Sequence, residues 1–147
     1  MPHDLLFVYG TLRRDSHHPM HQLLAGHGEF VDYATGPGQL YQLDGYPGMV
    51  DAAGSADRVK GEIWRLKHFA RAIRELDDYE ECGTSPDNPG LYTRLLQPFE
   101  TSAGTVDAWY YRYNDSIAGR QRIASGDYVE FTASSPAEPA AHSGGGK

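Results

Sequence analysis

A carboxylate ends the apolar stripe of the segment that most strongly favours a helix, residues 67–81. Phe69, Ile73 and Leu76 follow one another at spacings of four and three residues, and Glu80 comes four residues after Leu76. A helix turns by about 100° per residue, so Glu80 lies within about 20° of the direction of Phe69. The sequence therefore predicts a glutamate on the buried side of a helix, where it can act as general acid and base.

Three effects are expected to raise the pKa of Glu80. Burial disfavours the charged carboxylate, the helix C-terminus carries partial negative charge, and Asp77 adds a like charge one turn earlier. A carboxyl group with a raised pKa can accept and return a proton near neutral pH. Position alone leaves two other interpretations open: a glutamate that turns into water at the helix end, as expected for Glu81, or one paired with an arginine such as Arg94.

A second chemical feature lies where an apolar run reaches a glycine. Residues 5–9 are continuously apolar, which favours a strand buried on both faces, and the chain continues Gly10-Thr11-Leu12. Glycine lets a ligand approach the backbone closely, and successive N–H groups at such a turn can bind a carboxylate or an oxyanion. A plain turn at the end of a strand is the alternative that these residues leave open.

Other reactive residue types lack the pattern that their chemistry needs. His17 and His21 are spaced for a metal, and His18 lies between them, but no third ligand is evident. Cys82 follows the predicted helix C-terminus, which raises the pKa of a thiol instead of activating it. The sequence contains no G-x-S-x-G, and its terminal Gly-Gly-Gly-Lys lacks the context of a phosphate loop.

Composition limits the partners and the compartment. The 147 residues carry 13 Lys and Arg against 20 Asp and Glu, a formal charge of −7, so we expect neither nucleic acid nor a membrane as partner. The single cysteine excludes an intrachain disulfide. The first apolar run is too short for a signal peptide or a membrane span, and together these features predict a cytoplasmic protein.

The rest of the chain predicts short strands joined by Gly and Pro turns. A short helix is expected near residues 20–26, and strands are expected at 29–34, 38–43, 59–66, 91–97, 105–113 and 127–132. This pattern indicates an α+β domain over 1–132, with a curled, mostly antiparallel sheet or small barrel that protects its edges. Residues 133–147 are mostly Ala, Ser, Pro and Gly, which predicts a disordered tail.

The motifs, taken in order, resemble the γ-glutamylcyclotransferase-like family, which includes γ-glutamylamine cyclotransferases and AIG2-like proteins. The resemblance covers residues 5 to about 131 and rests on their order and spacing. The motifs are Val8-Tyr9-Gly10-Thr11-Leu12-Arg13, Tyr46-Pro47-Gly48, Val59-Lys60-Gly61-Glu62-Ile63-Trp64, Leu76-Asp77-Asp78-Tyr79-Glu80, Tyr92-Thr93-Arg94 and Ala108-Trp109-Tyr110-Tyr111.

The resemblance implies a fold and a reaction. The fold would be a mixed, mostly antiparallel β-barrel of about six or seven strands with two flanking helices. The reaction would release 5-oxoproline and a free amine from a small γ-glutamyl amine or peptide, without a metal or organic cofactor. Glu80 would be catalytic; Gly10, Thr11 and Leu12 would offer backbone N–H groups, and Tyr9, Tyr92 and Tyr110 are candidate hydrogen-bond partners of the substrate.

Two alternatives to a cyclotransferase would use the same site, and one segment can affect which substrate fits it. The chain can be a binding module for a small metabolite that does not catalyse, or an enzyme that uses Glu80 to cleave or transfer another amide. Residues 81–91 form a long connection that can serve as a lid or rim. The sequence predicts neither the leaving group nor the oligomeric state.

Overall fold

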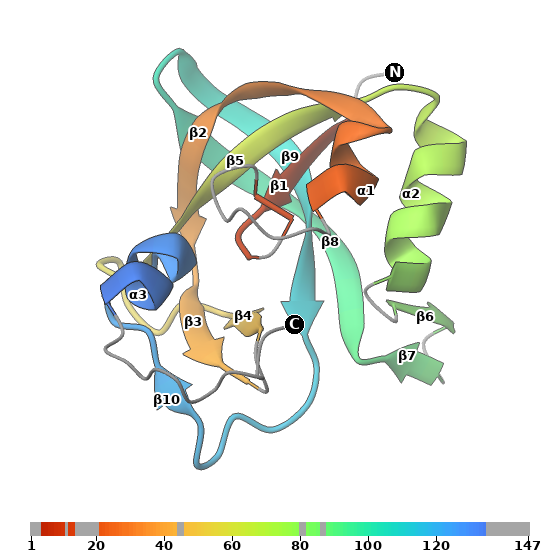
Figure 1. Ribbon diagram of the computed structural model, residues 1–147. Helices are drawn as coiled ribbons and strands as arrows, with labels where there is room; N and C mark the ends of the chain where they lie inside the picture. Colours follow the sequence, from red (N-terminus) through yellow and green to blue (C-terminus); the bar gives the residue numbers. More distant parts are fainter. Residues whose placement is uncertain are drawn as a thin grey trace.

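A closed barrel of five strands forms the centre of the molecule (Figure 1). The structure is a computed structural model that describes residues 4–10, 12–13, 21–43, 46–79, 82–85 and 88–134. The barrel strands are β1 (Leu5–Val8), β2 (Gly28–Pro37), β5 (Arg58–Leu66), β8 (Tyr92–Thr101) and β9 (Gly104–Tyr113). Their order is β9-β1-β5-β2-β8, and a further pairing between β8 and β9 closes the ring. The predicted mixed barrel is therefore confirmed, with five strands instead of six or seven.

Strand direction agrees with a mixed, mostly antiparallel sheet. β1 runs parallel to β9, whereas β1–β5, β2–β5, β2–β8 and β8–β9 are antiparallel. β8 and β9 form a long hairpin whose register runs from Tyr92 opposite Tyr113 to Thr101 opposite Gly104. Closure removes the unpaired edges that an open sheet of this kind would present.

Two small groups of strands extend the barrel on either side of this hairpin. β3 (Gln39–Gln42), β4 (Pro47–Val50) and β10 (Gln121–Arg122) attach through a parallel contact of Met49 with Arg112 in β9. β6 (Cys82–Ser85) and β7 (Asn88–Gly90) attach through a parallel contact of Cys82 with Tyr92 in β8. Part of the expected 81–91 connection is thus a pair of short strands.

Side chains of each barrel strand point alternately inward and outward, so the apolar residues form two clusters, one inside the barrel and one outside it. The inner cluster fills the barrel with residues from all five strands, including Phe7, Ala34, Ile63, Phe99 and Ala108. Its tightest contact is a stacked pair, Phe7 and Phe99, whose ring centroids are 4.0 Å apart. A barrel this small has an interior just wide enough for side chains, so it is a packed core and not a channel.

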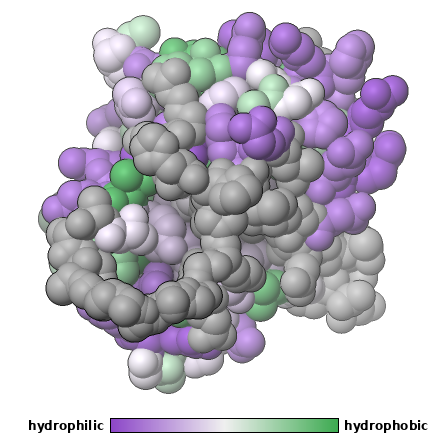
Figure 2. Space-filling model, viewed as in Figure 1, coloured by the Kyte–Doolittle hydropathy of each residue, from purple (hydrophilic) through white to green (hydrophobic). Residues whose placement is uncertain are grey.

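The outer cluster lies between the barrel wall and α2 (Phe69–Tyr79). Ala72, Ile73 and Leu76 of the helix are buried against the opposite face of β1 and β5. The exposed residues of α2 are mostly charged, and they coincide with the hydrophilic edge seen on the same side in Figure 2. The apolar stripe predicted from sequence is confirmed as far as Leu76; Glu80 lies outside the described residues.

Three helices occur in the described part of the chain: α1 (His21–Ala25), α2 and α3 (Tyr128–Ser134). The strand predicted at 127–132 is wrong, because this segment is α3. The Asp127 side chain accepts a hydrogen bond from the Glu130 N–H, which caps the helix N-terminus, and Tyr128 and Phe131 both pack on the inner cluster. Ala133 and Ser134, assigned above to the tail, belong to this helix. None of the described helices is both long and apolar enough to cross a membrane.

Candidate active site

The turn after β1 is closed by its own backbone and held by its neighbours. The Arg13 N–H donates to the Gly10 carbonyl at 3.0 Å, and the Leu12 side chain is buried in the outer cluster. A Cβ at Gly10 would stand 2.7 Å from Cγ of Pro47, so this glycine permits the close approach of β4. Thr11 lies outside the described residues. The structure thus describes most of the proposed anion-binding loop and one reason for its glycine.

Two further contacts fix the far side of the turn. His21 Nδ1 lies 2.8 Å from the Leu12 carbonyl, which makes Nδ1 the protonated nitrogen of this hydrogen bond. Arg13 is buried and donates to Asp127 at the start of α3, with Nη1 and Oδ1 2.9 Å apart. Arg13 is therefore a structural anchor between the turn and α3.

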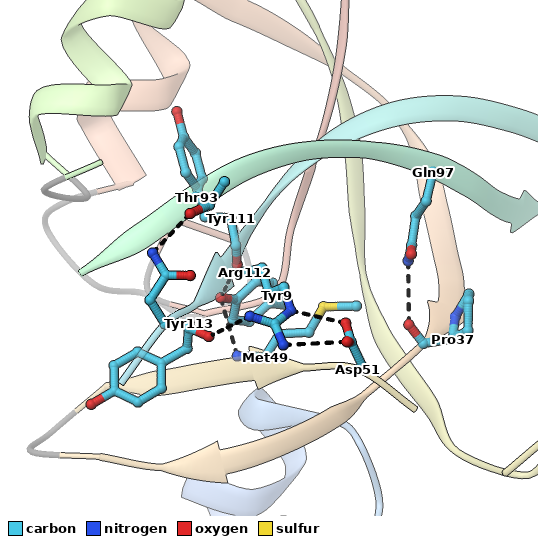
Figure 3. A network of polar contacts seen from close by, with 10 residues as sticks. Tyr9, Pro37, Met49, Asp51, Thr93, Gln97, Tyr111, Arg112 and Tyr113 are labelled. Atoms are coloured by element: carbon cyan, nitrogen blue, oxygen red, sulfur yellow. Dashed lines mark hydrogen bonds and ion pairs between the residues drawn. The ribbon is translucent and has the colours of Figure 1, made fainter. Parts of the chain in front are cut away.

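Tyr9 and Tyr92 use their hydroxyl groups to tie β4 to the barrel. Tyr9 donates to the Tyr111 carbonyl at 2.6 Å and accepts from the Met49 N–H at 3.3 Å (Figure 3). Tyr92 donates to the Pro47 carbonyl at 3.0 Å. A phenol has one proton to donate, so each of these hydroxyls has its donor committed to a backbone carbonyl.

Tyr110 differs from the other two tyrosines. It lies in the inner cluster, and no hydrogen bond joins its hydroxyl to another described residue. Burial raises the pKa of Tyr110, and the negative charge of Asp51 raises it further. Its phenol is consequently protonated at neutral pH and can donate a hydrogen bond to a ligand.

Of the two described residues that flank positions 80 and 81, one lies beside Tyr92. Tyr79 is the last residue of α2, and Cys82 is the Cα partner of Tyr92 across β6 and β8. Tyr92 in turn bonds Pro47, which packs on Gly10. Of the proposed site residues, Gly10 and Tyr92 meet at Pro47, Tyr9 and Tyr110 lie in the barrel interior, and Thr11 and Glu80 lie outside the described residues.

Two features of this region had a sequence signal that the prediction did not use. Glu62 is fully buried on the face of β5 shared with Trp64, whose Nε1 donates to Oε1 at 3.0 Å. Alternation with Trp64 and Leu66 already placed this carboxylate on an apolar face. Glu62 lies opposite Val8, directly before Tyr9 and Gly10. The other feature is β4. Its Pro47 contacts both Gly10 and Tyr92, and the N–H of its Met49 donates to Tyr9.

Asp77 is a carboxylate of α2 that accepts hydrogen bonds from the barrel strands β8 and β9. Arg94 donates to it through two nitrogens, at 2.9 and 3.1 Å, and the Tyr111 hydroxyl donates at 2.8 Å. Arg94, named above as a possible partner of Glu80, is thus bound to Asp77.

Two remaining features are the histidines considered above as metal ligands and a pocket on the barrel wall. Among the described residues no cluster of His, Cys, Asp and Glu could hold a metal ion, and His17 and His18 lie outside them. A pocket of about 520 Å³ opens beside Arg13, between the ends of β2, β5 and β8. Its charged side chains are already bonded in part to one another, as Arg13 is to Asp127 and Asp32 is to Ser102.

Comparison with known proteins defines the family. The profile of the family described as gamma-glutamyl cyclotransferase, AIG2-like, matches residues 6–130. The chain is 34% identical over 128 residues to the gamma-glutamylcyclotransferase family protein YtfP of Escherichia coli, covering 85% of this chain and 96% of that protein. It is 33% identical over 100 residues to the human gamma-glutamylaminecyclotransferase, covering 63% of this chain and 59% of that protein.

Solved structures share the fold. YkqA from Bacillus subtilis superposes with a TM-score of 0.69 at 28% identity, covering 88% of this chain and 40% of that one. A mouse AIG2-like protein superposes with a TM-score of 0.66 at 23% identity, covering 85% and 87%. With its five-stranded mixed barrel and these matches, the chain belongs to the γ-glutamylcyclotransferase-like, AIG2-like family.

Proposed function

We propose that this protein is a γ-glutamyl cyclotransferase with Glu80 as its general acid and base. The observation that supports the proposal is that two motifs occur within the family match: residues 9–12, which follow barrel strand β1, and residues 76–80, whose described part is the last turn of α2. The names of its relatives support a γ-glutamyl amine or peptide as substrate.

The proposed reaction is an internal aminolysis. The α-amine of the glutamyl group attacks its own γ-carbonyl, the new C–N bond closes a five-membered lactam, and the old amide C–N bond breaks. Glu80 takes a proton from the α-ammonium group and returns one to the departing amine. The products are 5-oxoproline and a free amine, and no water is consumed. Because the nucleophile belongs to the substrate, the protein needs chiefly to hold it folded.

The other site residues have supporting roles in this proposal. Backbone N–H groups of the Gly10–Leu12 turn bind the α-carboxylate or the oxyanion. Tyr110 is the tyrosine whose hydroxyl is best suited to donate to the substrate, since Tyr9 and Tyr92 donate to backbone carbonyls. Those two shape the site by holding β4 against Gly10.

The test is mass-spectrometric detection of 5-oxoproline after incubation with a panel of γ-glutamyl compounds: glutathione, γ-glutamyl amino acids and γ-glutamyl-ε-lysine. Wild type should release it from at least one compound, and Glu80→Gln should lose nearly all turnover while keeping its Tm. The matched control is Glu81→Gln, which removes the same charge one residue later and should remain active.

A third variant tests whether the role has been given to the wrong carboxylate. Glu62→Gln preserves the acceptor for the Trp64 N–H and removes the buried carboxyl group. An active Glu80→Gln with an inactive but folded Glu62→Gln would transfer the chemistry to Glu62. Absence of 5-oxoproline from every compound, with the fold intact, would favour a binding module or cleavage of a different amide.

A further inference from the structure

The C-terminal turn of α2 contains a carboxylate in an electrostatically unfavourable place. Asp77 lies in the last turn, where the helix itself carries partial negative charge, and that turn contains no basic residue. The positive charge comes instead from Arg94 on β8, which binds Asp77 through two nitrogens. A carboxylate kept at such a position and paired this closely points to a role beyond helix formation.

Two paired positions of the β8–β9 hairpin converge on this carboxylate, and a third supports one of them. Arg94 and Tyr111 are Cα partners in the hairpin, and both donate to Asp77. The Arg94 guanidinium lies over the ring of Trp109, with its Cζ 4.7 Å from the ring centroid. Stacking and the two-pronged hydrogen bond together fix the plane of the guanidinium. We call Asp77, Arg94, Tyr111 and Trp109 the α2 clamp.

The clamp gives α2 a directional contact with the barrel, which the apolar side of the helix does not provide. Ala72, Ile73 and Leu76 hold the helix on the barrel by burial, which is non-directional. A paired Arg–carboxylate contact is directional and adds geometric specificity. The clamp therefore fixes the rotation and axial position of the last turn, three residues before Glu80.

We infer that Asp77 is a positioning residue, which holds the last turn of α2 on the barrel and through it acts on the proposed catalytic residue, Glu80. This inference depends on the proposed function, because it assigns Asp77 a role through Glu80. Asp77 itself need not touch the substrate. Weakening the clamp should therefore lower kcat and leave KM nearly unchanged.

The experiment is a set of graded variants assayed on whichever γ-glutamyl compound wild type converts. Asp77→Asn should lower kcat by about 10- to 100-fold with KM within about twofold, since displacement of a catalytic group by about 1 Å costs up to about 100-fold. Tyr111→Phe removes one hydrogen bond, keeps the ion pair and should lower kcat less. The matched control is Asp78→Asn, which removes the same charge from an exposed neighbour in the same turn and should stay within twofold of wild type.

A second comparison separates positioning from simple stability. In a Glu80→Gln background, Asp77→Asn should cause no further loss of the residual turnover, because residues that act as a unit are not additive. Amide hydrogen exchange at residues 76–79 should accelerate in Asp77→Asn and not in Asp78→Asn. This exchange is measurable even if Asp77→Asn is less stable, and Tyr111→Phe provides the milder variant.

The outcomes distinguish this inference from the proposed function. A fully active Glu80→Gln refutes the proposed function. An inactive Glu80→Gln combined with an Asp77→Asn enzyme that matches Asp78→Asn in kcat and in exchange overturns the inference alone. A loss confined to KM, or a full additional loss in the Glu80→Gln background, also overturns it.

Discussion

The three tyrosines proposed to meet the substrate differ in what their hydroxyls already bind. Tyr9 bridges a carbonyl of β9 and an N–H of β4, Tyr92 binds a carbonyl of β4, and Tyr110 has no such bond to a described residue. A hydroxyl committed to buried backbone groups stabilises the fold, because its removal leaves those groups unsatisfied. A buried hydroxyl without such a partner is suited to bind a ligand.

Tyr9→Phe should therefore mainly reduce stability. Loss of the hydroxyl leaves the Tyr111 carbonyl and the Met49 N–H without this partner in a buried site, which costs about 1–3 kcal/mol. Thermal denaturation followed by circular dichroism should show a clearly lower Tm. An unchanged Tm would mean that the two backbone groups find other partners.

Tyr110→Phe should show the opposite pattern. We expect a Tm close to that of wild type and a kcat/KM about tenfold lower, the effect of losing one hydrogen bond to the substrate of about 1.5 kcal/mol. Steady-state kinetics and a melting curve on the same preparation give both values. Wild-type kinetics in Tyr110→Phe would remove this tyrosine from the site.

At the scale of elements, contact between the turn and β4 determines the shape of the site. Gly10→Ala would place a methyl group 2.7 Å from Cγ of Pro47 and 2.9 Å from its Cδ, so the turn and β4 must separate. We expect kcat/KM to fall by about tenfold or more, as small misplacements do. The control is Gly54→Ala, where no atom lies within 4 Å of the added Cβ and no comparable loss is expected. Equal activity of the two variants would separate this contact from catalysis.

The connection before β5 depends on one carboxylate and should make stability depend on pH. Hydrogen bonds, led by that from Gln39 and including the Ala53 and Gly54 N–H groups and Arg122, hold the pKa of Asp57 well below its usual range. The folded state therefore favours the charged form, so this stabilisation is present above pH of about 4 and fades as pH falls towards the folded pKa.

Asp57→Asn should accordingly lower the Tm at pH 7, and the difference from wild type should shrink as the pH falls below about 4. Melting curves at several pH values test this. Asp107→Asn, an exposed carboxylate on β9, serves as the control and should melt as wild type throughout. A difference that grows on acidification would contradict the assignment.

Elements with a clear period were predictable from sequence, and short or non-local ones were not. The alternation in the predicted strands 59–66 and 105–113 puts Trp64 on the same face as Leu66, and Trp109 on the same face as Tyr111, and all four belong to or pack on the outer cluster. β4, β6 and β7 are three or four residues long and contain Pro or Gly, so they resemble turns, and β10 has only two residues. α3 was taken for a strand because seven residues are too few to reveal a helical period.

The candidate site divides in the same way. The turn after β1 and the apolar stripe of α2 follow from local patterns. The pairing of Asp77 with Arg94 joins two separate elements, α2 and β8, and no local pattern predicts which of their residues meet. Closure of the barrel also depends on the pairing of β1 with β9 and of β2 with β8, which joins strands far apart in the sequence and is specified by no local pattern. The role of Glu80 stays a prediction, because that residue lies outside the described part of the chain.

At the scale of the whole molecule, the question is where the domain ends. The sequence predicted a boundary at residue 132, but α3 continues to Ser134 and supplies both apolar contacts and a charge to the barrel. Tyr128 packs on the inner cluster, and Asp127 neutralises the buried Arg13 that anchors the turn after β1. The end of the fold is thus coupled to its proposed substrate loop.

Two truncations test this coupling. A chain ending after Ser134 should keep the Tm and turnover of wild type, because it retains α3 and all of its described contacts with the barrel. A chain ending after Gly126 should melt at a much lower temperature, since loss of the partner of a buried charge costs about 3–5 kcal/mol and Tyr128 and Phe131 are lost with it. If that chain does not fold, Asp127→Asn isolates the charge and should raise KM, because Arg13 would no longer hold the turn that binds the α-carboxylate. Wild-type KM in a folded Asp127→Asn protein would show that α3 stabilises the barrel without acting on the substrate loop.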